Sequence, residues 1–168
     1  MRMLTIAALL ATLAPGLAGA QDDVWASRRL PWYVLPAHEL VGDAPVTLVT
    51  PGMVGACGAV SDRIDVFAAR GAVVLKFILK VDNGQVAISV RDPAAAAGGY
   101  SKTRILRPQD GEATVYVQVD AGSSPRAIAL CNIGEVGTGG QIEVMRVEAA
   151  RLLGLPADEA AKVNLGAL

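Results

Sequence analysis

Side chains that can transfer protons, attack a substrate or ligate a metal are scarce in this chain of 168 residues. His38 is the one histidine, so a Ser-His-Asp site would have to be built on it. Prolines flank its segment, and the sequence contains no Gly-x-Ser-x-Gly turn to present a nucleophilic serine. The sequence therefore favours a packing or exposed role for His38, and it predicts no catalytic residue, no metal and no other cofactor.

Paired carboxylates are the enzymatic chemistry that the composition leaves open. A glycosidase needs two Asp or Glu side chains at a fixed separation. The acidic residues here lie mostly in predicted turns, such as Asp82 and Asp120, or on outward strand positions, such as Asp65 and Glu143. Their spacing does not show that any two of them converge, so a carboxylate-based hydrolase is the third of three functional hypotheses.

Cys57 and Cys131 are the two cysteines, so only one intramolecular disulfide can form. The chain has no Cys-x-x-Cys motif, and no basic residue adjoins either cysteine to indicate a reactive thiol. A disulfide persists in an exported protein, and closing so long a loop contributes roughly 4 kcal/mol on the chain-entropy model. We predict a structural disulfide between them, with two buried free thiols as the alternative.

Aromatic side chains offer another kind of chemistry, because a sugar ring has an apolar C–H face that stacks on an aromatic ring. Polar neighbours would then bond to the ligand's hydroxyl groups. The candidate ligand-binding residues are Trp32, Tyr33, Tyr100 and Tyr116 for stacking, and Arg104, Asp110 and Asn132 for hydrogen bonds. In the alternative, Trp32 pins its segment onto the domain and contacts no ligand.

The elements that must position these residues begin after an expected signal peptide at residues 1–20. Arg2 precedes an apolar run of about ten residues, and Ala18-Gly19-Ala20 forms a small-x-small cleavage site. The run is shorter than the about 20 residues of a membrane-spanning helix. We expect an exported chain, periplasmic or extracellular in a bacterium, with no transmembrane segment after cleavage; an uncleaved N-terminal anchor is the alternative.

Residues 21–44 are expected to form an extended N-terminal arm, because Pro31 and Pro36 prevent a long helix. From Val46 onward apolar residues recur with period two, which is typical of half-buried strands. The runs fall at 46–48, 64–66, 73–81, 86–90, 115–119, 128–130 and 142–144. Asp82-Asn83-Gly84 has the residues of a tight hairpin turn.

The fold class predicted from this pattern is all-β: an antiparallel, jelly-roll-like β-sandwich of about eight strands with a short C-terminal helix. The sandwich should occupy residues 45–148, and residues 149–168 should form the C-terminal helix and tail. Within this end we expect a helix from about Glu148 to Leu153 and a turn at residues 157–162. The register break at Met145 indicates either a bulge or the start of that helix.

The strands at 113–119 and 141–144, with the segment 126–134 that ends in Asn132-Ile133-Gly134, resemble parts of galactose-binding domains and carbohydrate-binding modules. This resemblance covers about half of the chain, and it implies a jelly roll that binds a saccharide without chemical turnover. A fold likeness alone does not establish function.

Charge and composition exclude some of the remaining functional classes. Fifteen Lys and Arg face sixteen Asp and Glu, which argues against a strongly basic nucleic-acid binder. A hydrophobic content of 52% argues against a disordered chain. We therefore expect an exported, non-catalytic binding module for a saccharide or cell-envelope glycan; the alternative is an accessory subunit that docks on an envelope protein.

Overall fold

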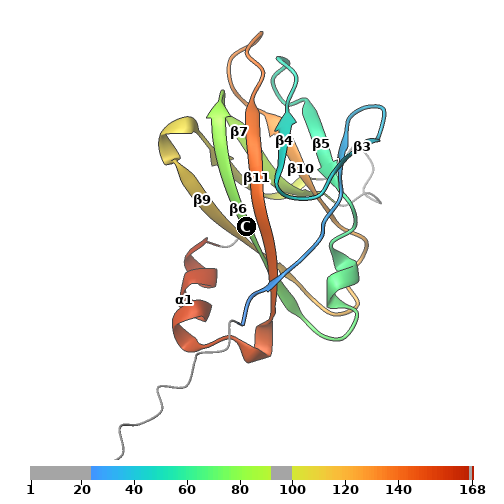
Figure 1. Cartoon of the computed structure of the whole chain (residues 1–168), viewed down its shortest axis with the longest axis vertical. Coiled ribbons are helices and arrows are strands. Elements are labelled where there is room, and N and C mark those ends of the chain that lie inside the picture. The colour runs from blue at the N-terminus through green and yellow to red at the C-terminus, as the bar shows by residue number, and fades with distance from the viewer. Residues whose placement is uncertain (1–23, 92–99, 167) are drawn as a thin grey trace, which may run out of the picture.

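The structure is a computed structural model, and it describes residues 24–91, 100–166 and 168. The expected signal peptide at residues 1–20 lies outside the described residues. Two antiparallel sheets face each other, and a short helix near the C-terminus lies beside one of them (Figure 1). The prediction of an all-β sandwich with a short C-terminal helix is confirmed.

Eight strands form the body of the sandwich and are divided between the two sheets. They are β4 (Val46–Val49), β5 (Cys57–Ser61), β6 (Val73–Asn83), β7 (Val86–Arg91), β8 (Tyr100–Leu106), β9 (Glu112–Val119), β10 (Ala127–Asn132) and β11 (Gln141–Arg151). The first sheet has the order β4-β11-β6-β9, and the second has the order β5-β10-β7-β8. Strands distant in sequence thus lie side by side, which is the arrangement of a double-sheet jelly roll.

The core lies between the sheets and is built from alternate residues of each strand. In β6 the inward positions Leu75, Phe77 and Leu79 are completely buried. Residues of β9 and β11 meet them from neighbouring strands of the same sheet, and residues of β7 and β10 meet them from the opposite sheet. The period-two pattern therefore identified the inward face of β6 correctly.

Residues 24–44 contribute short strands to both sheets, and a turn at residues 35–38 folds the segment back on itself as a hairpin, so it does not continue as a single extended arm. β1 (Ala26–Ser27) pairs with the end of β11 in the first sheet. β2 (Trp32–Val34) pairs with β5 in the second sheet, and β3 (Glu39–Gly42) forms the edge beside it. The segment crosses from one sheet to the other and so becomes part of the sandwich.

A second, smaller apolar cluster lies on the outer face of the first sheet, under α1 (Ala157–Gly166). Val163 of the helix packs with Trp25 and Tyr116, whose ring centroids are 5.8 Å apart. Glu159 accepts a hydrogen bond of 2.8 Å from the Trp25 indole N–H. Hydrogen bonds from Lys162 and from Trp25 lower the pKa of Glu159, so the carboxylate that fastens the helix stays ionised.

Asp82-Asn83-Gly84 does not close a hairpin, so that prediction is wrong. β6 and β7 belong to different sheets, and the turn carries the chain across the sandwich. Gly84 has a φ of +74°, as a tight turn requires. A Cβ on Gly84 would lie 2.8 Å from the Gly139 carbonyl oxygen, because the turn packs against the loop that leads into β11.

The predicted helix at Glu148–Leu153 is also wrong, because β11 continues as a strand to Arg151. The register of β11 on β6 shifts between Val144 and Arg146, which places a bulge at Met145. Beyond the bulge, Val147 and Ala149 point into the core again. The helix begins later, at Ala157, directly after Pro156. None of the described helices is long and apolar enough to cross a membrane.

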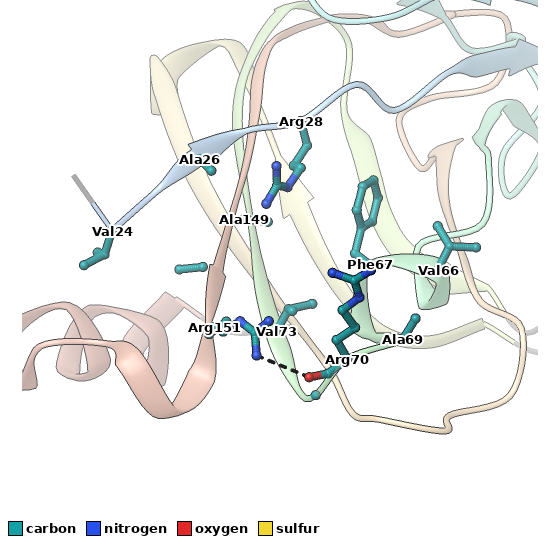
Figure 2. Close-up of a pocket in the computed structure, with 12 residues that line it drawn as sticks. Val24, Ala26, Arg28, Val66, Phe67, Ala69, Arg70, Val73, Ala149 and Arg151 are labelled. Atoms are coloured by element: carbon teal, nitrogen blue, oxygen red, sulfur yellow. Dashed lines mark hydrogen bonds between the residues drawn. The ribbon is translucent and has the colours of Figure 1, made fainter. Parts of the chain in front are cut away.

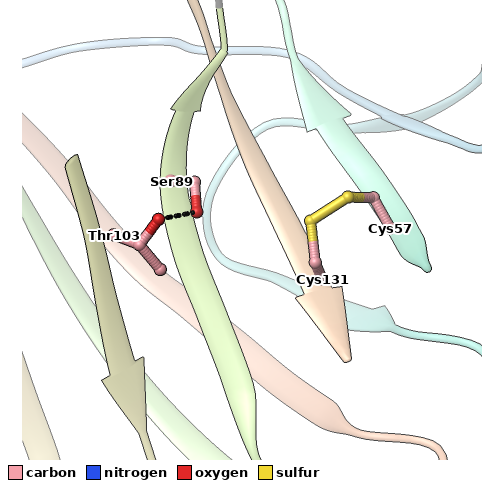
Figure 3. The surroundings of a disulfide bond; sticks show 4 residues. All are labelled: Cys57, Ser89, Thr103 and Cys131. Carbon is pink, nitrogen blue, oxygen red and sulfur yellow. Dashed lines mark hydrogen bonds between the residues drawn. A yellow bond between two sulfur atoms is a disulfide. The ribbon is translucent and has the colours of Figure 1, made fainter. Parts of the chain in front are cut away.

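The predicted disulfide is confirmed. Cys57 of β5 and Cys131 of β10 are bonded across two neighbouring strands, 74 residues apart in the sequence (Figure 3). Toward the β8 edge of the same sheet, the hydroxyl groups of Ser89 in β7 and Thr103 in β8 lie 2.9 Å apart in a hydrogen bond. The second sheet is thus tied covalently at β5 and by a side-chain hydrogen bond near its β8 edge.

Candidate functional site

Two hollows are lined in part by residues 61–72, which comprise the end of β5 and its connection to β6 and contain the short 3-10 helix η1 (Asp65–Ala68). Both are also lined by the N-terminal segment, residues 24–38. The first, called here the Tyr33 groove, has a volume of about 340 Å³ and is lined mainly by Tyr33, His38, Ser61, Asp62, Arg63 and Arg91.

Tyr33 reaches the groove because of its place on β2. It pairs with Val60 of β5 on one side and with Leu40 of β3 on the other. Successive strand residues point to opposite faces of a sheet. Trp32 therefore points into the core, where it is 0% exposed, and Tyr33 faces outward.

The expectation that Trp32 stacks on a ligand is accordingly wrong, because its buried ring offers no face to one. The alternative role, in which Trp32 holds the N-terminal segment onto the domain, agrees with its place in the main core.

The charged side chains of the groove differ in how many hydrogen bonds they already make within the protein. The Arg63 guanidinium pairs with Asp65, which also accepts a hydrogen bond of 3.1 Å from the Arg126 N–H. The bond from Arg63 lowers the pKa of Asp65. Arg91 differs, since its Nε is buried and has no hydrogen-bond partner among the described residues. One oxygen of Asp62 accepts a bond of 2.7 Å from the Arg63 N–H.

The groove holds a serine, a histidine and an aspartate, but their bonds are not those of a catalytic triad. The Ser61 hydroxyl donates to the Asp62 carbonyl oxygen at 2.7 Å and accepts from the Ile128 N–H at 2.9 Å. No hydrogen bond joins His38 to Ser61 or to Asp62 within the described residues. The serine is thus engaged with the backbone, and its hydroxyl has no hydrogen bond to a base among the described side chains.

The remaining candidate residues lie elsewhere. Tyr116 is 7% exposed beneath α1 and packs on Trp25. Arg104 donates to the Thr114 carbonyl oxygen at 2.9 Å, which ties β8 to β9. Tyr100 begins β8, and its side chain is outside the described part of the chain.

Asp110 and Asn132 both organise loops. The Asp110 carboxylate accepts from the Arg107 N–H at 2.8 Å and closes the turn η2 (Pro108–Asp110). The fully buried Asn132 amide bonds to Thr138 and Gly134 of the loop before β11. Among the candidates with a described side chain, Tyr33 alone lines one of the two hollows beside residues 61–72.

The second hollow, called here the arginine pocket, was not anticipated from the sequence. It has a volume of about 510 Å³, and Arg28, Arg70 and Arg151 lie around it with Val66, Phe67 and Val73 (Figure 2). These arginines come from three distant segments, so no local spacing relates them. Among the described residues, no group of three or more His, Cys, Asp or Glu could hold a metal ion.

Comparisons with known proteins place the chain in no family. No family model matches it, and no curated protein matches it. One solved structure with a similar fold is the naturally occurring empty particle of the cowpea mosaic virus top component, at 13% sequence identity and a TM-score of 0.38. The match covers 77% of this chain and 84% of the viral one. At so low a score the likeness assigns no function to this chain.

Proposed function

We propose that this chain is an exported, non-catalytic binding module for a saccharide and that the Tyr33 groove is its site. One observation carries the proposal: an outward-facing tyrosine, a carboxylate and an arginine whose buried Nε has no partner among the described residues line the same hollow. Its volume of about 340 Å³ falls in the range of small-molecule sites.

The chemistry of these groups suits a neutral, polyhydroxylated ligand. The Tyr33 ring supplies a flat apolar surface for the C–H face of a sugar ring. Asp62 accepts hydrogen bonds from hydroxyl groups and Arg91 donates them, so a hydroxyl pair can satisfy both. Charges of opposite sign in one groove favour a dipolar ligand over an ion of either sign.

Saccharides of the cell envelope are the ligand class that suits an exported chain. The Cys57–Cys131 disulfide is compatible with an oxidising compartment, where such bonds persist. The signal peptide expected at residues 1–20 would deliver the chain there. A glycan of the envelope is therefore a ligand that the exported chain would meet.

A glycan array probed with the purified chain tests the proposal, with Tyr33→Ala and Tyr33→Phe in parallel. Stacking contributes about 0.5–1.5 kcal/mol beyond the buried area, so loss of the ring should weaken binding by about tenfold or more. Tyr33→Phe keeps the ring and should retain most of the affinity. The matched control is Leu40→Ala, which changes the exposed strand neighbour of Tyr33 outside the groove. Absence of saturable glycan binding, or equal binding by Tyr33→Ala, would count against the saccharide site.

Docking on an envelope protein is the second candidate function, and exposed apolar side chains at one end of the sandwich favour it. Met53 and Val136 are 70% and 84% exposed, and their loops are joined by a hydrogen bond of 2.7 Å from the Gly137 N–H to the Gly52 carbonyl oxygen. If this end docks on a protein, Val136→Asp should abolish cross-linking to that protein and leave glycan binding unchanged.

A further inference from the structure

We infer that the arginine pocket is a second ligand site and that it takes an organic oxyanion, a carboxylate or phosphate carried on an apolar body. The pocket is lined by residues from the later part of the segment 61–72, whereas the Tyr33 groove is lined by residues 61–63, and the two share no lining residue. The inference therefore stands independently of the saccharide proposal.

Three arginine side chains line this pocket. Arg28 follows β1, Arg70 follows η1, and Arg151 ends β11. Figure 2 shows the side chains of Arg28 and Arg70 extending from opposite walls toward the middle of the pocket. A guanidinium carries five N–H donors in a planar fork, and this fork matches carboxylate and phosphate oxygens in pairs.

No carboxylate among the described residues neutralises this group of arginines. The pocket lining contains no acidic residue, and the described ion pairs use other cations. Glu148, on the same strand as Arg151, is paired with Lys76 at 2.6 Å and with Arg146 at 3.1 Å. Like charges held together repel each other, and a bound anion removes that repulsion.

The backbone around the arginines is fixed in advance of binding. The Arg28 N–H donates to the Val147 carbonyl oxygen at 2.8 Å, which locks the N-terminal segment onto β11. The Leu152 N–H donates to the Ala72 carbonyl oxygen at 3.1 Å, which joins the end of β11 to the chain after η1. Arg151 itself donates to the Arg70 carbonyl oxygen at 3.3 Å. Binding would thus cost little ordering of the main chain.

Apolar walls indicate that the ligand is more than a bare ion. Val66 is 55% exposed at the pocket, although valine is usually buried. The half-buried ring of Phe67 lies next to the Arg70 side chain (Figure 2). A ligand with an apolar body would cover Val66 and Phe67 while its oxyanion meets the arginines.

Calorimetric titration of the purified chain with four probes tests the inference. Phenyl phosphate and benzoate carry both features, inorganic phosphate carries the charge alone, and phenol carries the ring alone. We expect saturable binding of phenyl phosphate or benzoate, weaker binding of inorganic phosphate and none of phenol. The affinity should fall as the salt concentration rises, because exposed charges are screened. If phenol binds as well as phenyl phosphate, or if neither anion saturates, the inference fails.

Substitutions locate the site. Arg28→Gln and Arg70→Gln should each weaken phenyl phosphate binding roughly threefold to tenfold, as expected for the loss of a charge-assisted hydrogen bond in a partly exposed site. Arg146→Gln is the matched control, since it removes an exposed arginine of β11 outside the pocket. An equal loss in the control would show binding to general positive charge and would overturn the inference.

A third variant tests whether the chain supplies its own anion. Asp22 and Asp23 precede Val24 in the sequence and lie outside the described residues. We expect the unaltered chain to bind phenyl phosphate without their removal. If binding occurs only in Asp22→Asn/Asp23→Asn, the pocket serves an internal contact and the ligand site is refuted. Glycan binding should be unchanged in Arg28→Gln and Arg70→Gln, so the two proposals can fail separately.

Discussion

The indole of Trp32 is completely buried in the main core, whereas the ring of Tyr33, one residue later, lies at the surface of a groove. Trp32→Ala should lower the free energy of unfolding by about 3–5 kcal/mol, because it leaves a large cavity. Tyr33→Ala should lower it by about 1 kcal/mol or less, since the position is only partly buried. Urea unfolding of both variants checks this; comparable losses would contradict the assigned orientations.

Asp65 should make stability depend on pH at the acidic end. Its pKa is lowered, first by the hydrogen bond from Arg63 and also by that from the Arg126 N–H. A folded-state pKa below the unfolded value of about 3.9 means that the contribution is complete above that pH and is lost as the pH falls through the folded value. Between pH 6 and pH 3, the wild-type chain should therefore lose more stability than Asp65→Asn. Thermal unfolding across this range measures the difference, and parallel curves would contradict it.

At the residue scale, sequence alone could say that Trp32 and Tyr33 face opposite ways but not which one faces inward. That choice depends on the pairing of β2 with β5, since this pairing places Trp32 opposite Ser61 and Tyr33 opposite Val60. Asn132 shows a similar limit. Its amide resembles a ligand-binding group in the sequence, yet the loop before β11 folds back onto it and uses its hydrogen bonds.

At the scale of elements, period-two runs predicted most of the strands because one face of each sheet is buried. The run at 64–66 was wrong, because these residues lie at the start of the 3-10 helix η1. The same pattern could not assign strands to sheets. A turn such as Asp82-Asn83-Gly84 suits a hairpin and a crossing equally, and only the partners of β6 and β7 decide between them. The end of β11 was mistaken for a helix because the bulge at Met145 interrupts the alternation for one residue.

The disulfide gives an element-scale prediction. Cys57→Ala/Cys131→Ala should lower the free energy of unfolding by about 2–5 kcal/mol, because the closed loop spans 74 residues of the unfolded chain. β5 should remain paired with β10, since backbone hydrogen bonds also join them. Chemical denaturation gives the magnitude, and far-ultraviolet circular dichroism should show an unchanged strand content. A variant as stable as the wild type would show that the bond adds nothing to stability.

At the scale of the whole molecule, the arginine pocket was beyond sequence reasoning. Arg28, Arg70 and Arg151 are ordinary exposed positions when each is read locally, and they become a group only where three segments meet. The Tyr33 groove could be predicted in part, because the sequence analysis identified the aromatic residues of the N-terminal segment as candidate ligand contacts. Its polar partners Asp62 and Arg91 could not, since Asp62 follows β5 and Arg91 ends β7, and the sequence does not relate these two strands.

Truncation tests how the molecule depends on its last strand. A chain that ends before Gln141 lacks β11 and should be unfolded, because β11 pairs with β1, β4 and β6. A chain that ends at Pro156 lacks only α1 and the tail, and it should keep its sheets with reduced stability as Trp25 and Tyr116 become exposed. Limited proteolysis and circular dichroism distinguish the two outcomes. A folded product without β11 would contradict the dependence.

The position of β11 near the end of the sequence also determines when the first sheet can form during synthesis. Val49 in β4 can pair with Gln141 only after all of the intervening chain has emerged from the ribosome. Until then the early strands present apolar faces and unpaired edges, which are the features that favour pairing between molecules. Few contacts between neighbouring segments also make such a topology slow to fold, on the order of milliseconds to seconds. A newly synthesised chain should therefore be most prone to self-association before β11 has been made.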